Sequence, residues 1–267
     1  MTRSTVRKSY VDLADGQLHV REVAGSEPAI VFLHQTACSA QSYDPLLAEL
    51  DVPNRLVAID TPGFGGSFDP SGWPSLANYA AWILEGIDAL GTRQFHVFGH
   101  HTGSSLAVYL AAHHPQRVLS IMLAGAELLT PEERRQFRES HGEPIAPQRD
   151  GSHLQVNWNY AAGYNEGVPA EIIHDEVVSM LRAWKARPQA YRAVAASDTP
   201  ALAAGLTVPV LLLTSPDDYF HAELDRAKAT FPGAAIATTG GANFQPTADP
   251  EGVARAVEAF LAALPQA

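Results

Sequence analysis

The segment GHHTG at residues 99–103 has the residue types and spacing to place a reactive side chain on a strained turn. It follows an apolar run that predicts a strand ending at Gly99, and a helix is predicted from about Thr102 onward. Glycines are needed at 99 and 103 because any side chain there would collide with the neighbouring strand or helix. His101 lies at the centre, and histidine in general titrates at about pH 6.5, which suits proton abstraction at neutral pH.

Four further segments occur in the order and at the separations typical of the α/β-hydrolase fold superfamily. They are FLHQTACSA at 32–40, DTPGFGGS at 60–67, LLLTSPDD at 211–218 and TTGGANFQPTADPEGVARAVEAFL at 238–261. The first resembles the loop after the third strand of that family, and the second its D-x-P-G-x-G-x-S loop. The third is similar to its acid-bearing strand and turn, and the fourth to its last strand, histidine loop and closing helix. With the elbow, the resemblance covers the chain apart from an inserted lid.

The resemblance implies roles for individual residues. The backbone amides of Thr36 and Thr102 would form an oxyanion hole, the second at a helix N-terminus where amides lack partners. The elbow centre, normally Ser, or Asp or Cys in some branches, is His101 here, and the position of the triad histidine holds Asn243. Only the acid position, Asp218, is kept. Because neither Asn243 nor its neighbours take up a proton near neutral pH, a serine-type relay cannot be assembled at these positions.

We therefore expect His101 and Asp218 to form a base and the group that orients it, bridged or steered by Asn243. An imidazole is longer than a serine side chain, so at the elbow it would occupy roughly the space of the absent histidine. The base would activate a water molecule or deprotonate the substrate directly, a contribution of about 10²–10⁴ in rate. The helix N-terminus would disfavour imidazolium, whereas the carboxylate would favour it. The alternative is that His101 only fills the space of a lost serine.

Weaker candidates surround the expected pocket. Gln35 and Cys38 belong to the loop after the third strand, and Cys38 is either a thiolate nucleophile or, as we favour, a buried structural thiol. His221 follows the acid turn and is either a substitute triad histidine or a solvated loop residue. His34 is expected to anchor its loop by hydrogen bonds, and His100 to point into the fold.

The span 127–200 interrupts the alternation of strands and helices and is charged, proline-containing and rich in aromatics. It predicts a helical cap inserted in the core. Its aromatic residues either form the core of the cap itself or line an apolar pocket, which would favour a hydrophobic substrate. The main ones are Trp158, Tyr160, Tyr164 and Trp184.

The remaining elements predict an α/β fold. An opening hairpin is expected at about 10–23, followed by buried parallel strands at 29–34, 55–60, 95–99, 118–125 and 208–214. Helices are predicted at 75–90, 103–112 and 250–264. The alternation predicts a mostly parallel, doubly wound sheet built from residues 1–126 and 201–267, with the ligand site at the carboxyl ends of the strands.

The composition limits the partners. A net charge of −11 without a basic block argues against nucleic acid or an anionic membrane surface. The single cysteine rules out an internal disulfide and a cysteine-based zinc cluster, and it fits a cytoplasmic protein. The histidines lack metal-ligand spacing, so neither a metal nor a cofactor is expected. We expect a small-molecule substrate, with a homodimer left open.

Three functions of different classes fit these observations. The one we favour is an enzyme, a hydrolase or lyase, that acts on a small hydrophobic carbonyl compound by general-base hydrolysis or by C–C or C–X bond cleavage. The second is a cofactor-independent oxygenase, since some members of this fold deprotonate an aromatic substrate with a His and Asp dyad. In those members the histidine occupies the position that Asn243 holds here. The third is a ligand-binding protein that has lost catalysis.

Overall fold

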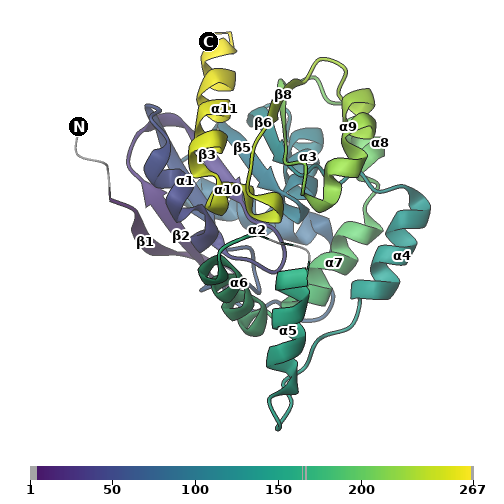
Figure 1. Cartoon of the computed structure of the whole chain (residues 1–267). Coiled ribbons are helices and arrows are strands. Elements are labelled where there is room, and N and C mark those ends of the chain that lie inside the picture. Colours follow the sequence, from purple (N-terminus) through teal and green to yellow (C-terminus); the bar gives the residue numbers. More distant parts are fainter. Residues whose placement is uncertain (1–4, 164, 166, 266–267) are drawn as a thin grey trace.

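The computed structural model describes residues 5–163, 165 and 167–265, and in this part of the chain the strands form one eight-stranded sheet (Figure 1). The strands are β1 (Arg7–Leu13), β2 (Gly16–Val23), β3 (Ser26–Leu33), β4 (Asn54–Ile59), β5 (Phe95–His100), β6 (Val118–Ala124), β7 (Val210–Thr214) and β8 (Ala235–Thr238). Their order is β1-β2-β4-β3-β5-β6-β7-β8. β2 pairs antiparallel with β1 and β4, and every other pairing is parallel. The predicted mostly parallel sheet and the opening hairpin are confirmed.

Helices connect the strands and cover both faces of the sheet. The α-helices are α1 (Asp44–Glu49), α2 (Leu76–Ala89), α3 (Thr102–His113), α4 (Pro131–His141), α5 (Ser152–Gly163), α6 (Ala170–Arg182), α7 (Ala186–Ala196), α8 (Thr199–Ala203), α9 (Leu224–Thr230), α10 (Gln245–Ala248) and α11 (Pro250–Ala263). Short 3₁₀ helices are η1 (Ala40–Tyr43), η2 (Tyr219–Glu223) and η3 (Ala242–Phe244). The three helices predicted from the sequence, now α2, α3 and α11, lie within two residues of their expected bounds.

The hydrophobic core has two layers because alternate strand residues point to opposite faces of the sheet. In β3, Val31 and Leu33 pack with α2 and α3 on one face. Ile30 and Phe32 pack with α1 and α11 on the other face. Burial on both faces explains why these strands are continuous apolar runs in the sequence.

The sheet order brings the segments that follow β3, β5, β6 and β7 to one edge. These four strands are consecutive neighbours and run parallel, so their carboxyl ends lie side by side. In an open α/β sheet this edge is where ligands bind. Residues far apart in the sequence therefore meet there.

Helices α4 to α8 follow β6 and precede β7, and most of them gather at one end of the molecule (Figure 1). Helices α4 to α7 lie within the predicted cap region 127–200, and α8 begins in it and ends at Ala203. An apolar cluster joins them to the rest of the fold. In it, Ile173, Val177 and Met180 of α6 pack with Phe64 and Phe244, which lie outside this region. Tyr164, one of the aromatic residues considered for the cap, lies outside the described residues.

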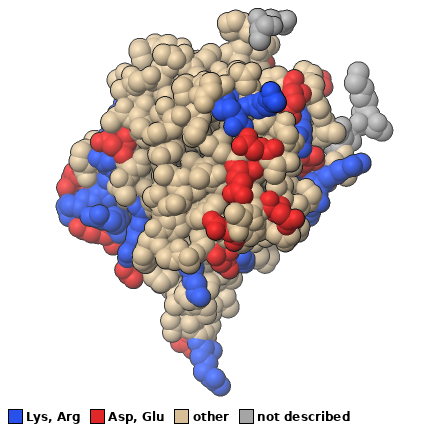
Figure 2. All heavy atoms as spheres, turned by 180° about the vertical axis from the view of Figure 1, so that it is seen from behind, with Lys and Arg blue, Asp and Glu red and all other residues tan. Residues whose placement is uncertain are grey.

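Surface charge is mixed on the face shown in Figure 2. Lys and Arg side chains stand beside Asp and Glu side chains there, and no continuous basic area forms on that face.

Among the described residues, no helix combines the length and the apolar character needed to cross a bilayer.

The elbow between β5 and α3 depends on two glycines. A Cβ atom at Gly103 would overlap the backbone carbonyl of Leu33, and one at Gly99 would overlap the carbonyl of Gly103. Both obstacles are backbone atoms, which cannot rotate away as a flexible side chain can. Close backbone contact therefore fixes the point where the chain turns from strand to helix.

We predict that Gly103→Ala lowers the free energy of unfolding by about 1–3 kcal/mol, the usual cost of overpacking a tight core. Chemical denaturation followed by circular dichroism measures the change. Gly233→Ala is the matched control, because a Cβ atom at Gly233 meets nothing within 4 Å. Equal stability of the two variants would show that the elbow tolerates a side chain at residue 103.

Candidate active site

His101 stands at the elbow in a backbone conformation that side chains rarely adopt. Its φ is 47° and its ψ is −112°, and it is the N-cap of α3. Such a conformation costs about 1–3 kcal/mol and persists only where the surrounding structure enforces it. The ring lies partly buried, edge-on to Phe220 with centroids 5.0 Å apart. The strained turn holds the imidazole at the carboxyl edge of the sheet.

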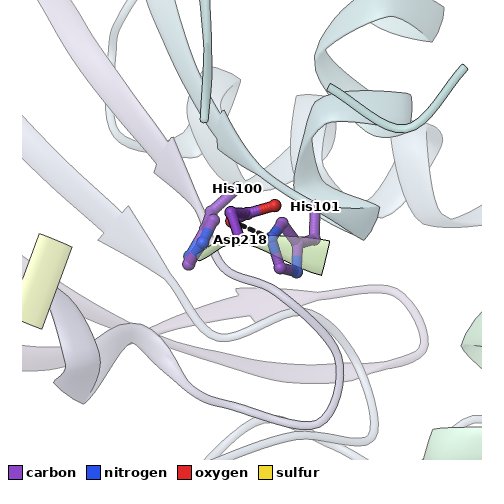
Figure 3. A group of neighbouring side chains, drawn as sticks. All are labelled: His100, His101 and Asp218. Carbon is purple, nitrogen blue, oxygen red and sulfur yellow. Dashed lines mark hydrogen bonds and ion pairs between the residues drawn. The ribbon is translucent and has the colours of Figure 1, made fainter. Parts of the chain in front are cut away.

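The structure places the His101 ring against Asp218, the contact expected from the sequence (Figure 3). The distance from His101 Nε2 to Asp218 Oδ2 is 2.8 Å, and the Asp218 side chain is fully buried. Burial alone would raise the pKa of Asp218, but attraction to His101 and their hydrogen bond outweigh it and hold the pKa below its ordinary value. Asp218 is therefore a carboxylate that accepts a hydrogen bond from the imidazole.

Two other groups fix the Asp218 carboxylate. Its Oδ1 accepts a hydrogen bond of 2.7 Å from the Phe220 backbone amide, and its Oδ2 accepts one of 3.0 Å from Gln245 Nε2. Gln245 is completely buried, and its own Oε1 accepts a hydrogen bond from Thr239 Oγ1. The sequence analysis missed Gln245, although an amide between the apolar residues Phe244 and Pro246 was a visible signal.

Asn243 lies in the same loop and lines the cavity in front of His101. Its Oδ1 accepts a hydrogen bond of 2.8 Å from the Tyr219 amide, and its Nδ2 donates one of 3.0 Å to Asn165 Oδ1. Asn243 thus braces the backbone next to Asp218 against the segment after α5. The expected role of steering the carboxylate directly falls to Gln245.

Thr36 and Thr102 also meet, but their arrangement differs from a simple pair of amides. The Thr36 amide donates a hydrogen bond of 2.8 Å to the Thr102 hydroxyl oxygen, which in turn lies 3.0 Å from the Thr36 hydroxyl. The Thr102 amide remains in the first turn of α3, where amides lack intrahelical partners. The Thr102 side chain therefore takes up a donor that the resemblance assigned to the oxyanion hole.

A cavity of about 120 Å³ opens in front of His101. Gln35, Thr36 and Thr102 line it from the core, together with Asn243. The other lining residues are Glu127, Phe137, His141, Tyr160, Ala161, Asn165, Glu176, Tyr191, Tyr219, Phe220 and Phe244. Aromatic rings therefore form much of the wall, and several belong to the predicted cap.

Four of the residues predicted for the pocket lie elsewhere. Trp158 is partly exposed on α5, and Trp184 carries the Lys185 ammonium 5.0 Å from its ring. His221 Nδ1 is 2.8 Å from Thr214 Oγ1, which ties it to the end of β7. Cys38 lines a different cavity, bounded by α6. Of the aromatic residues considered for the wall, Tyr160 lines the cavity and the two tryptophans do not, whereas Phe137 and Tyr191 line it without having been predicted. Helix packing decides which faces point inward.

Cys38 has the properties of a structural thiol. The side chain is 6% exposed, and burial together with the nearby Glu176 carboxyl raises the pKa of the thiol well above its ordinary value. A nucleophilic cysteine needs the opposite shift, toward the thiolate. This environment favours the structural interpretation of Cys38.

The two flanking histidines occupy interior positions. His34 Nε2 accepts a hydrogen bond from the Thr61 amide and its Nδ1 donates one to the Gln35 carbonyl, which anchors the loop after β3. His100 is 2% exposed, and burial lowers its pKa well below the ordinary value. The hydrogen bonds of His34 thus hold the loop next to His101, and the buried His100 packs beside the His101 ring, with ring centroids 4.4 Å apart.

His100, His101 and Asp218 also form the one group of three metal-ligating side chains found among the described residues (Figure 3). Their ligand atoms lie within 4.8 Å of one another. The Asp218 oxygens already accept hydrogen bonds from His101, Gln245 and the Phe220 amide. An ion would have to displace some of these bonds. A base oriented by a carboxylate therefore accounts for the geometry better than a metal site does.

Two buried carboxyl groups in the cavity wall were not predicted. Glu127 follows β6 and is 1% exposed, and burial raises its pKa to about 7. Glu176 lies on α6, and burial raises its pKa as well. The position of Glu127, three residues after the end of a buried strand, could have indicated it, because the carboxyl edge of the sheet was the expected ligand site. Glu176 carried no comparable signal.

Known proteins resemble the chain in sequence and in fold. Residues 28–143 match the family model described as alpha/beta hydrolase fold. A haloalkane dehalogenase of Mesorhizobium japonicum is 29% identical over 140 residues, which are 52% of this chain and 44% of that protein. A fluoroacetate dehalogenase of a Burkholderia species is 32% identical over 119 residues, 43% of this chain and 39% of that protein. The matched part spans less than half of the length of each of these relatives.

The fold likeness extends over nearly the whole chain. The solved structure of a hydrolase from Pseudomonas aeruginosa PA01 superposes with a TM-score of 0.78 and 22% sequence identity, covering 96% of this chain and 98% of that one. The sheet order, the strained elbow and the matched segment agree with this likeness. The chain therefore has the α/β-hydrolase fold.

The raised pKa of Glu127 predicts a specific dependence of stability on pH. Between its ordinary value of 4.5 and its value of about 7, the folded protein binds more protons at this group than the unfolded chain does. The free energy of unfolding therefore falls as pH rises through this range. Glu127→Gln removes this contribution, worth up to about 3 kcal/mol because one pKa unit corresponds to about 1.4 kcal/mol.

Denaturation curves of both proteins between about pH 5 and about pH 8 measure the effect. The difference in stability between Glu127→Gln and the wild type should increase with pH. Glu171→Gln, at an exposed position on α6, should follow the wild-type curve. Parallel curves for the wild type and Glu127→Gln would mean that Glu127 ionises at its ordinary pH.

Proposed function

We propose that the protein is an enzyme in which His101, oriented by Asp218, acts as a general base on a small hydrophobic carbonyl compound. The observation that carries this proposal is the 2.8 Å contact between His101 Nε2 and Asp218 Oδ2 at the strained elbow, with the imidazole lining the cavity. A base held in this way can abstract a proton from water or from the substrate.

The hydrogen bond to Asp218 selects the nitrogen that accepts the proton. Because the Asp218 carboxylate accepts a bond from Nε2, that nitrogen carries the hydrogen in the neutral imidazole. The lone pair is then on Nδ1, and the ring geometry turns Nδ1 away from Asp218 (Figure 3). When Nδ1 takes a proton, the buried carboxylate stabilises the imidazolium that forms.

The surroundings of His101 support general-base chemistry over a protein nucleophile. The Thr102 hydroxyl is engaged with the Thr36 amide and hydroxyl. Cys38 lies outside the lining of this cavity, and its thiol is kept protonated because burial raises its pKa. A bond cleavage in this site would therefore use water or an elimination step in place of a covalent enzyme intermediate.

The cavity supports a small substrate with an apolar part. Its volume of about 120 Å³ is small, and Phe137, Phe220 and Phe244 contribute apolar wall. Because two relatives are named haloalkane dehalogenase and fluoroacetate dehalogenase, cleavage of a carbon–halogen bond belongs among the reactions to be tested.

We predict that His101→Ala reduces turnover at least about a hundredfold, because the loss of a positioned base removes about 10²–10⁴ in rate. Product formation would be followed by mass spectrometry in ¹⁸O-labelled water. The panel would contain esters, lactones, 1,3-diketones, hydroxyquinolones, a haloalkane and fluoroacetate. Label entering the product from the wild type would identify water as the attacking group.

Two further variants sharpen this test. Asp218→Asn should also be slow, since the imidazolium then loses its buried charge partner. His221→Ala should keep nearly the wild-type rate, because His221 lies outside the cavity lining and bonds to Thr214. Equal rates for His101→Ala and the wild type would contradict the mechanism. Oxygen consumption would identify an oxygenase, and tight binding without turnover a binding protein.

A further inference from the structure

Glu127 is held against the helix that begins at the elbow. Its backbone amide donates a hydrogen bond of 3.0 Å to the Ser104 hydroxyl, and the Ser105 hydroxyl donates one of 3.3 Å to its Oε2. Both serines belong to the first turns of α3, directly after His101. Glu127 and His101 are therefore positioned by the same piece of structure, and both line the cavity.

The other carboxyl oxygen of Glu127 has no hydrogen-bond partner among the described residues. Oε1 is buried, and a buried polar atom without a partner costs about 1–3 kcal/mol. The protein groups around it leave this cost uncompensated, and the residue lines the cavity. An unpaired buried oxygen calls for an explanation, and a bound molecule that reached Oε1 would supply the missing partner.

A further hydrogen-bond donor would be useful where the substrate oxygen develops negative charge. The Thr36 amide donates to the Thr102 hydroxyl, so one of the two amides that usually stabilise a developing negative charge is engaged. A carboxylic acid that an apolar environment keeps protonated can donate a hydrogen bond to the developing oxyanion in place of a backbone amide. Burial raises the pKa of Glu127 to about 7, so much of this group stays protonated at neutral pH.

Glu176, the other buried carboxyl in the wall, is placed differently. It lies close to the Cys38 thiol, and the positive charge of Arg187 partly offsets the effect of burial on its pKa. It also borders the second cavity, which Cys38 lines. Like Glu127, Glu176 has one buried oxygen without a partner among the described residues, and its pKa is affected by His101. Glu127 differs because its hydrogen bonds with Ser104 and Ser105 hold it at the helix that begins at the elbow.

We propose that Glu127 is a second catalytic residue, the acid that protonates the carbonyl oxygen of an enolisable ketone while His101 removes the α-proton. This inference rests on the proposed function and names its substrate class. Nδ1 of His101 takes the α-proton, and the C–H electron pair forms the carbon–carbon double bond. The π pair of the carbonyl moves to oxygen, which takes the proton from Oε1 of Glu127. The product is an enol. When the two proton transfers reverse, a proton returns to either face of the enol carbon, which exchanges or relocates the α-proton.

The test is the exchange of α-protons for deuterium in D₂O, measured by NMR with cyclohexanone and phenylacetone. We expect Glu127→Gln to slow exchange at least about tenfold, since an amide cannot donate a proton in this range. The wild-type rate should fall above about pH 7 as Glu127 loses its proton, and this decline should be missing in Glu127→Gln. Glu171→Gln, at the exposed position on α6, is the control and should behave as the wild type.

The outcomes separate the two proposals. If His101→Ala abolishes exchange while Glu127→Gln keeps the wild-type rate and pH profile, the role of Glu127 is overturned and the base remains. If both variants exchange as the wild type does, or if the wild type exchanges neither ketone, the deprotonation step fails together with the role of Glu127.

Infrared difference spectra of the wild type and Glu127→Gln give a readout without substrate. A protonated-carboxyl band that titrates at about pH 7 supports the proposal, and its absence at neutral pH overturns it.

Discussion

The hydrogen bond between His101 and Asp218 is the interaction on which the site depends. It joins residues that are 117 positions apart, and its length of 2.8 Å demands that both side chains be placed accurately. The parallel neighbours β5, β6 and β7 bring the two segments to the same edge of the sheet. The glycines of the elbow then allow the turn that carries the imidazole, and Gln245 holds the carboxylate. The buried Asp218 carboxylate is stabilised because the imidazole, the Gln245 side-chain amide and the Phe220 backbone amide surround it.

At the same edge of the sheet, the pKa values of two carboxyl groups are shifted in opposite directions. Asp218 receives hydrogen bonds from His101, Gln245 and a backbone amide, and its pKa lies below the ordinary value despite burial. Glu127 receives one long bond from Ser105 at 3.3 Å, and burial raises its pKa to about 7. The number of donors around each carboxyl group thus moves the two pKa values in opposite directions. Such a separation is typical of groups that have different roles in one site.

The helices between β6 and β7 complete the cavity. They supply Phe137, Tyr160 and Tyr191 to its wall, and the Tyr191 hydroxyl donates a hydrogen bond of 3.1 Å to the Thr36 carbonyl. This bond connects α7 to the loop after β3, next to the reacting centre. Loss of water around an imidazole and a carboxyl strengthens their interactions with a substrate. The helices between β6 and β7 therefore affect the electrostatics of the site as well as its size.

The sequence by itself determined the main strands, three of the helices that cover the sheet, and the elbow. These features follow from local signals, namely continuous apolar strands and glycines at a forced turn. Asp218 was indicated by its place in a motif that resembles the α/β-hydrolase fold, and its contact with His101 comes from the tertiary structure. Only the tertiary structure decided which cap aromatics face the cavity, that Gln245 reaches Asp218, and that the Thr102 hydroxyl takes the Thr36 amide. Each of these depends on how a helix or loop is rotated and placed against its neighbours. Burial, which sets the ionisation of Glu127, is likewise a property of the packed chain and not of the residue or its neighbours in sequence.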